Sequence, residues 1–151
     1  MIKELNSLEE INAASLLCWG CFIKFQAPTL TDEGVETFKQ LVSYEMLKKK
    51  HETNELELFG FFQEGNLVGI IALKEHSHIS LFFVKEEYHN VGIGKKLMSF
   101  IVERCKSRQC LKLTLNSSIY ANEVYKKFGF ISLNSVQELN GIIYIPMELK
   151  L

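Results

Sequence analysis

Hydrophobic residues recur along this chain with two different periods, and the change of period separates predicted helices from predicted strands. In the first third, apolar positions repeat every three or four residues, as on one face of an amphipathic helix. The pattern predicts a helix over about 8–24, with the capping-box pair Ser7 and Glu10 at its start. It predicts a second helix from Thr31 to the lysines at 48–50.

Runs of aliphatic and aromatic residues follow, and such runs are typical of strands. Two of them, 56–62 and 67–73, flank a short loop with Gly65 and predict a β-hairpin. Pro146 lies in the last run and has no N–H to donate, which favours an edge strand or a bulge. The remaining predicted elements are strands over 78–84, 110–115 and 142–149 and helices over 92–106 and 118–128. This order predicts an α/β fold with a mixed sheet, antiparallel at the front and with helical crossovers later.

Length and composition add the expectation of an ordinary globular protein. The chain has 151 residues, of which 47% are hydrophobic and 23% charged, and we expect a single domain over 1–151. No apolar run approaches the roughly 18 residues of a membrane span, and the N-terminus lacks the apolar segment of a signal peptide. We therefore expect a cytoplasmic protein that contacts no membrane.

The net charge of −1 gives no indication of a nucleic-acid partner, but the charges are unevenly distributed. Residues 1–60 hold six lysines against ten acidic residues, and residues 61–151 hold eleven basic residues against eight acidic ones. The acidic part favours a cationic substrate and the basic part an anionic cofactor. Two ordinary solvated faces would give the same counts.

Four cysteines are present, and two of them form the sequence Cys18-Trp-Gly-Cys21. This spacing occurs in redox pairs and in half of a zinc site. The other two, Cys105 and Cys110, do not supply a second pair at the matching spacing, so we expect no metal. Cys18 and Cys21 continue the apolar stripe of the first helix, which favours buried thiols in a reducing compartment.

The strand over 78–84 leads into a glycine-containing turn that opens a helix. Gly92-Ile93-Gly94 allows close approach to the backbone. The free N–H groups and the dipole of the first helical turn attract an anion there, and Lys95 and Lys96 add positive charge. These features suit a pyrophosphate, although many such turns bind nothing. A dinucleotide fingerprint is excluded because Leu97 replaces its third glycine, and no P-loop is present.

Two motifs in this part of the chain resemble those of the GNAT superfamily of N-acetyltransferases. After Val84, His89-Asn90-Val91-Gly92-Ile93-Gly94 matches the family signature Gln/Arg-x-x-Gly-x-Gly/Ala, with His89 in the place of Gln or Arg. Further on, Asn116 and the segment from Ala121 through Tyr125 to Phe130 match a strand-end asparagine followed by Ala-x-x-x-Tyr-x-x-x-Gly-Phe. The resemblance covers about residues 56–149.

The resemblance implies transfer of an acetyl group from acetyl-CoA to an amine, by direct attack in a ternary complex. In such folds the strand ending at Val84 splays from the strand over 111–115, and the pantetheine arm lies in the opening. The backbone N–H of Val84 is then the implied donor to the developing oxyanion. The implied cofactor-binding residues are Phe82, Phe83, Val84, His89, Asn90, Val91, Gly92, Ile93, Gly94, Lys95 and Asn116.

This reaction requires a neutral amine and a proton for the leaving thiolate. Given the resemblance, Tyr125 is the candidate general acid, although tyrosine on an apolar stripe is often simply core. His78 is the candidate base, because some family members carry a glutamate at that place and a histidine pKa of ~6.5 suits the task. A polar strand start with proton relay through water is the alternative for His78. Asn116 alternatively caps the next helix.

The expected acceptor is a primary amine of a small molecule or a peptide. A non-catalytic acyl-CoA-binding or sensory module of the same fold is the alternative function. A nucleotide-binding switch is disfavoured, because no magnesium-ligating Ser or Thr follows the lysines at the turn. Exposed edge strands would permit a homodimer.

Overall fold

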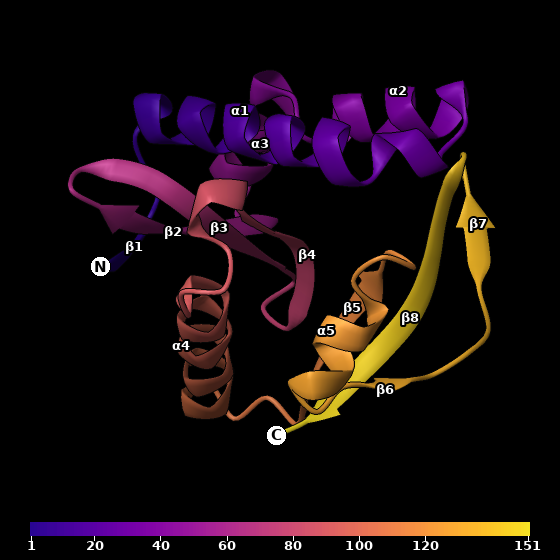
Figure 1. Ribbon diagram of the computed structural model, residues 1–151. Helices are drawn as coiled ribbons and strands as arrows, with labels where there is room; N and C mark the ends of the chain where they lie inside the picture. The colour runs from indigo at the N-terminus through magenta and orange to yellow at the C-terminus, as the bar shows by residue number, and fades with distance from the viewer.

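The computed structural model describes residues 1–151 and shows a twisted eight-stranded sheet between two layers of helices (Figure 1). The helices are α1 (Leu8–Phe25), α2 (Asp32–Leu41), α3 (Tyr44–Glu52), α4 (Ile93–Ser107) and α5 (Asn122–Lys127), with short 3-10 turns η1 (Ala27–Thr29) and η2 (Glu86–Tyr88). The strands are β1 (Ile2–Glu4), β2 (Leu56–Gln63), β3 (Asn66–Lys74), β4 (His78–Val84), β5 (Lys112–Ser117), β6 (Ile131–Ser132), β7 (Gln137–Leu139) and β8 (Ile142–Lys150). The strand order is β1-β2-β3-β4-β5-β8-β6, with β7 paired to β8.

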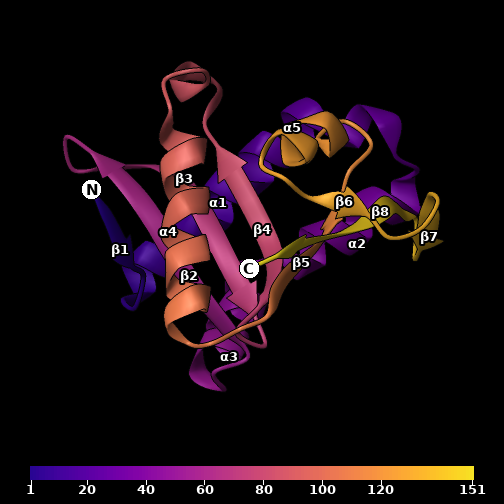
Figure 2. The same cartoon turned by 90° about the horizontal axis from the view of Figure 1, so that it is seen from below.

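The predicted α/β class with a mixed sheet is confirmed, and its two faces carry separate cores. On one face, α1 and α3 pack over β2, β3 and β4 around residues such as Phe22, Leu58 and Ile70. On the other face, α4 and α5 pack over β2 to β5 and β8 around Leu97 and Met147 (Figure 2). No helix is both long and apolar enough to cross a lipid bilayer.

Helix α1 begins and is buried as the sequence predicted. The Ser7 hydroxyl accepts the N–H of Glu10 at 3.1 Å, and the Glu10 carboxylate accepts the N–H of Ser7 at 3.1 Å, so the capping box is present. Cys18 and Cys21 are buried free thiols, and burial raises the pKa of Cys21 to about 11. A protonated, buried thiol is unreactive, which confirms the core interpretation of the Cys-x-x-Cys sequence.

The single helix predicted from Thr31 to 48–50 is wrong, because the chain forms two helices that meet at Val42 and Ser43. The Ser43 hydroxyl accepts the N–H of Met46 at 3.3 Å and starts α3. The Val42 carbonyl accepts a hydrogen bond from the Ser15 hydroxyl of α1 at 2.6 Å. A long-range contact and a local cap therefore fix the bend between the two helices. The apolar periodicity of the sequence continues through the bend, so it did not predict it.

The C-terminal strand is interior, so of the two alternatives drawn from Pro146, an edge strand or a bulge, the edge strand is wrong. β8 pairs with β5 on one side and with β6 and β7 on the other. Pro146 lies opposite Asn116, and its carbonyl accepts the N–H of Leu133 at 2.8 Å on the far side. The Pro146 nitrogen lies on the same side of β8 as that carbonyl, so the missing N–H falls where the pairing with β6 ends and before the pairing with β7.

The strands β4 and β5 form a parallel pair over a very short distance and then separate. Only His78 with Thr114 and Ile79 with Leu115 are paired. A bulge in β4 at Ser80 shifts the register against β3 at the same level. Beyond it the two strands diverge, as Figure 2 shows, and we call the opening the fork. The splay implied by the family resemblance is therefore present.

Candidate active site

Backbone groups of β4 that would normally bond a neighbouring strand face the fork. The N–H of Lys85 donates to the Val68 carbonyl at 2.9 Å, which makes these two residues a hydrogen-bonded pair between β4 and β3. Because bonded and non-bonded pairs alternate along antiparallel strands, the N–H and C=O groups of Phe82 and Val84 point away from β3, toward β5. A ligand that pairs like a strand can therefore bond to them.

The opposite side of the fork presents Asn116 in the same way. The N–H of Leu151 bonds the Leu111 carbonyl at 3.0 Å, and alternation along β5 and β8 turns the backbone groups of Asn116 toward β4. Asn116 does not cap the next helix, because the Ser118 hydroxyl instead accepts the N–H of Ala121 at 3.1 Å. The capping alternative for Asn116 is therefore wrong.

Phe83 differs from its two neighbours in β4. Its backbone belongs to a bonded pair with Ile70 of β3, so it offers nothing to the fork. Its ring lies on the α1 face and meets the Phe38 ring edge-on at 5.9 Å. Among the three residues implied for this strand, Phe82 and Val84 present the fork backbone and Phe83 supports it by packing.

The start of α4 is an uncapped helix N-terminus beside the end of β4. Gly92 has φ of 89°, a left-handed conformation that favours glycine, and no side chain caps the helix. The first intrahelical bond runs from the Lys96 N–H to the Gly92 carbonyl at 3.0 Å. The N–H groups of Ile93, Gly94 and Lys95 are therefore unpaired and available to an anion. We call residues 90–95 the cradle.

The basic residues near the cradle are not equivalent. A groove of about 830 Å³ begins at Gly92 and runs down one face of α4 past Lys95, Lys96 and Arg104. The Lys96 ammonium lies 5.8 Å from the centre of the Phe61 ring, turned toward β2. Lys95 stands in the first helical turn and is exposed, so it is the better placed of the two lysines for a phosphate.

His89 bonds within the protein. Its ring Nε2 lies 2.7 Å from the Val84 carbonyl oxygen, one of the groups that face the fork. The ring also stacks on Phe25 at 5.5 Å, and Phe25 stacks on Tyr120 at 5.8 Å. The end of α1 thus contacts the segments that follow both strands of the fork. Sequence reasoning did not find this contact, and its one signal was the histidine in place of Gln or Arg.

Tyr125 approaches the fork from the α5 face. Its side chain is 9% exposed, and its ring lies 6.0 Å from that of Phe82. Its hydroxyl bonds no protein group. The one fully buried side-chain nitrogen or oxygen without a partner in this protein is Arg104 Nε, so the Tyr125 hydroxyl is not fully buried and touches solvent. Burial raises the pKa of Tyr125 above its ordinary value of 10.0. The phenol therefore stays protonated and can donate.

His78 approaches from the opposite face. Its neighbour Ile79 belongs to the same core as Tyr125, and side chains alternate along a strand, so the imidazole points to the α1 side. Its Nδ1 lies 2.7 Å from the Thr114 hydroxyl of β5. Burial, and then the positive charge of Lys74, lower the pKa of His78 below 6.5. The imidazole is thus neutral at pH 7 and can accept a proton.

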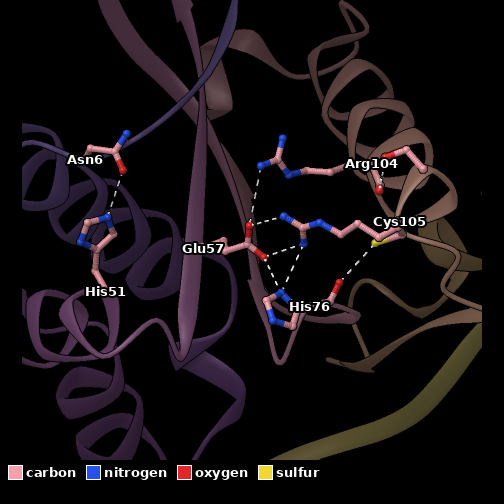
Figure 3. Close-up of polar contacts among 8 residues, drawn as sticks. Asn6, His51, Glu57, His76, Arg104 and Cys105 are labelled. Carbon is pink, nitrogen blue, oxygen red and sulfur yellow. Dashed lines mark hydrogen bonds and ion pairs between the residues drawn. The ribbon is translucent and has the colours of Figure 1, made fainter.

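His76 belongs to a different cluster, although it precedes His78 by two residues. The Arg108 guanidinium donates two hydrogen bonds to the Glu57 carboxylate, at 2.7 and 2.6 Å. His76 Nδ1 lies 3.3 Å and Arg104 3.8 Å from the same carboxylate (Figure 3). We call these four residues the Glu57 cluster. It ties β2 to the end of α4, away from the cradle.

The fork, the uncapped helix start and the tyrosine thus lie together, and the helix start offers free N–H groups beside an open sheet edge. Residues 26–151 match the family model of the acetyltransferase (GNAT) domain, and the chain belongs to this family. The expectation drawn from the two motifs is confirmed.

Several proteins are similar to this chain. It is 25% identical over 118 residues to the spermine/spermidine N(1)-acetyltransferase of Bacillus subtilis (strain 168), covering 68% of this chain and 77% of that protein. A GCN5-related N-acetyltransferase structure from Rhodopseudomonas palustris has a TM-score of 0.86 at 17% identity, with coverage of 100% of this chain and 95% of that one. The PaiA N-acetyltransferase of Thermoplasma acidophilum in complex with coenzyme A has a TM-score of 0.77 at 21% identity, with coverage of 100% and 99%. The two structures share the fold.

Proposed function

We propose that this protein transfers the acetyl group of acetyl-CoA to a primary amine, by direct attack in a ternary complex. One observation carries the proposal: the fork brings outward-facing backbone groups next to an uncapped helix start, with Tyr125 and His78 on its opposite faces. The fork suits an arm that pairs like a strand, and the helix start suits a pyrophosphate.

The residues would divide the cofactor between them. The unpaired N–H groups of the cradle, with Lys95, would hold the pyrophosphate. The fork-facing groups of Phe82, Val84 and Asn116 would pair with the pantetheine amides. The Val84 carbonyl already has two partners, His89 Nε2 at 2.7 Å and the Cys21 thiol at 3.6 Å, so the Val84 N–H is the group left for the cofactor.

The two faces of the fork would supply the proton transfers. The amine would attack in its neutral form, which alone has the lone pair, and His78 would take the proton that the nitrogen loses as the amide forms. The new C–N bond forms as the C–S bond breaks, and a fork-facing N–H of β4 would stabilise the developing oxyanion. The Phe82 N–H suits this task, because Phe82 lies beside Tyr125, whereas the Val84 N–H implied by the resemblance is six residues from His78, roughly 20 Å along the strand. Tyr125 would give its proton to the leaving thiolate and be reprotonated by the solvent that it touches.

The comparisons favour an enzyme over the alternative of an acyl-CoA-binding module. The similar Bacillus protein is named for acetylation of spermine and spermidine. This chain also keeps a protonated tyrosine beside the fork, which binding alone does not require. We therefore propose a small-molecule amine as the acceptor, in preference to a peptide.

The test uses Tyr125→Phe, with Tyr44→Phe in α3 as the matched control because Tyr44 lies in the other core. CoA binding is followed by calorimetry and turnover by release of the CoA thiol with a panel of amines. We expect Tyr125→Phe to bind CoA but to lose ~10²-fold or more in kcat, whereas Tyr44→Phe keeps its turnover.

Each contrary result has its own meaning. Absence of CoA binding by the unaltered protein would overturn the whole proposal. Binding without thiol release for any amine would instead establish the module. Full turnover by Tyr125→Phe would remove the tyrosine from the mechanism while leaving the transfer reaction in place.

A further inference from the structure

The sheet face that carries His78 continues past the fork as a row of polar side chains. His78 of β4 is paired with Thr114 of β5, and Thr114 is paired with Glu148 of β8. Residues directly opposite in neighbouring strands point to the same face. The next residue of β8 toward the N-terminus, Met147, is buried in the α4–α5 core, which independently places Glu148 on the His78 face.

Helices leave this part of the face uncovered. The core beneath α1 and α3 draws its sheet residues from β2, β3 and β4 and none from β5 or β8. Helix α2 packs against the β7–β8 end of the sheet, where Gly34 meets Gly141 backbone to backbone and the Thr37 hydroxyl bonds the Asn140 carbonyl at 2.7 Å in the turn before β8. The row of His78, Thr114 and Glu148 is therefore reachable from the side on which His78 would receive an amine.

Glu148 is a largely buried carboxylate whose one ionic partner is exposed to solvent. Its side chain is 13% exposed, and the Lys112 ammonium lies 3.4 Å from its Oε2. Lys112 is itself 58% exposed and stands two residues before Thr114, on the same face. An exposed lysine pair contributes little to stability. The Lys112 ammonium is chemically a primary alkylammonium, so its position shows where such a group from a ligand can be held.

We infer that Glu148 anchors the second, charged nitrogen of a linear diamine or polyamine acceptor. The inference rests on the proposed function, because the first nitrogen must be neutral at His78 to react. At this level β4, β5 and β8 are all paired, so His78 and Glu148 stand two strand spacings apart, about 10 Å, across Thr114. The two side chains and a short chain of methylene groups span this distance together. Lys112 leaves the carboxylate when the acceptor ammonium arrives.

The inference explains selectivity between amines with one and with two positive charges, which the catalytic groups alone do not provide. His78 and Tyr125 would act on any amine that reaches the fork. Glu148 would bind more tightly those amines that carry a second positive charge at the right distance. The neutral imidazole of His78 does not repel the incoming cation. The Bacillus relative named for spermine and spermidine acts on acceptors of this class.

The experiment compares putrescine with n-butylamine, which has the same carbon chain and one amine fewer. The readout is the ratio of kcat/KM for putrescine to kcat/KM for n-butylamine, from thiol release at saturating acetyl-CoA. We expect Glu148→Gln to lower this ratio at least about tenfold, through KM for putrescine, since a charged hydrogen bond is lost. Lys112→Met should raise the ratio, because the competing ammonium is gone.

The control is Glu4→Gln, which removes an exposed carboxylate from β1 at the far edge of the sheet and should leave the ratio unchanged. Thermal melts verify that Glu148→Gln folds. An unaltered ratio in a folded Glu148→Gln protein would overturn the inference, as would an equal loss for both amines. The proposed function fails separately, if the unaltered protein acetylates neither amine although it binds CoA.

Discussion

The two ends of α4 differ in whether their backbone polar groups are hydrogen-bonded within the protein. At the C-terminal end the helix is closed: the N–H of Cys110 bonds the Cys105 carbonyl at 3.0 Å, the N–H of Gln109 bonds the Lys106 carbonyl at 2.9 Å, and Gln109 has φ of 63°. The Glu57 cluster adds a two-bond ion pair there. At the N-terminal end, the N–H groups of Ile93, Gly94 and Lys95 in the cradle have no protein partner.

This difference indicates how one helix serves both stability and binding. Satisfied groups at the closed end stabilise the fold and have nothing left for a ligand. The N–H groups at the open end are left to water in the free protein, and an anion that replaces this water stabilises the folded state by binding. We therefore expect substitutions at the fork and cradle to change function, and substitutions in the Glu57 cluster to change stability.

The largest effect is expected at His78. His78→Gln should lower kcat by ~10²-fold near neutral pH, because the proton acceptor is lost. In the unaltered protein, kcat/KM should rise with pH through the His78 pKa, which lies below 6.5 because burial and Lys74 disfavour the charged form. This rise of kcat/KM at acidic pH should be missing in His78→Gln. The second rise, caused by deprotonation of the amine substrate near its own pKa of ~10, should remain.

His76→Gln is the matched control for this experiment, since His76 lies two residues away in the Glu57 cluster. It should keep the full pH profile. If kcat/KM of His78→Gln still rises with pH in the acidic range, solvent rather than the imidazole receives the proton. The division between a functional fork and a structural Glu57 cluster would then be weaker than we propose.

The next largest effect is expected at Glu57. Glu57→Gln leaves the Arg108 and Arg104 guanidinium groups without their carboxylate, and should cost about 1–3 kcal/mol in the free energy of unfolding. Glu103→Gln, at an exposed position of α4, should change it by less than about 0.5 kcal/mol. Urea melts give both values, and calorimetry should show the same CoA affinity for all three proteins.

The same pair of proteins gives a dependence on pH. The Arg108 guanidinium, ahead of the other contacts, holds the pKa of Glu57 below its ordinary 4.5. A carboxyl with a depressed pKa in the folded state stabilises the protein fully above the unfolded-state pKa, and this is lost as the pH falls through the folded-state value. The difference between the unaltered protein and Glu57→Gln should thus narrow below pH 4.5. A constant difference would contradict the ionic origin.

The smallest effect is expected at Gly92, and Gly65 provides its control. Both have left-handed φ, of 89° and 80°, and at neither position would an added Cβ meet an atom within 4 Å. Gly92→Ala and Gly65→Ala should thus lose similar stability, about 1–2 kcal/mol each. Only Gly92→Ala should also weaken CoA binding, by a few-fold, because its methyl stands beside the unpaired N–H groups. Equal CoA affinities of the Gly92→Ala and Gly65→Ala proteins would show that the cradle does not bind the cofactor.

The features that could be predicted from the sequence are those with local signals. The capping box at Ser7, the hairpin around Gly65 and the glycines at the start of α4 each lie within a few residues of their cause. Features that depend on pairing were displaced or missed. The strand expected at 110–115 runs from Lys112 to Ser117, and the helix expected at 118–128 is confined to Asn122–Lys127. The short strands β1, β6 and β7 gave no signal, because each exists only through its partner strand.

The candidate site divides in the same way. By family resemblance, the sequence named Tyr125 and His78, but it did not show that they flank the fork from opposite faces. It grouped Phe83 with Phe82 and Val84, although alternation in the ladder turns its backbone away from the fork. Neither the Glu57 cluster nor Glu148 could be found without the register of strands far apart in the chain.

The amino-acid sequence by itself indicated the family, the glycine-containing start of α4 and the candidate acid and base, because motif spacing and helix-start signals act over a few residues. The tertiary structure decided where β4 leaves β5, which backbone groups stay unpaired there and which side chains share a face. Those properties depend on the parity of strand pairing, and a shift of one residue in register reverses every one of them.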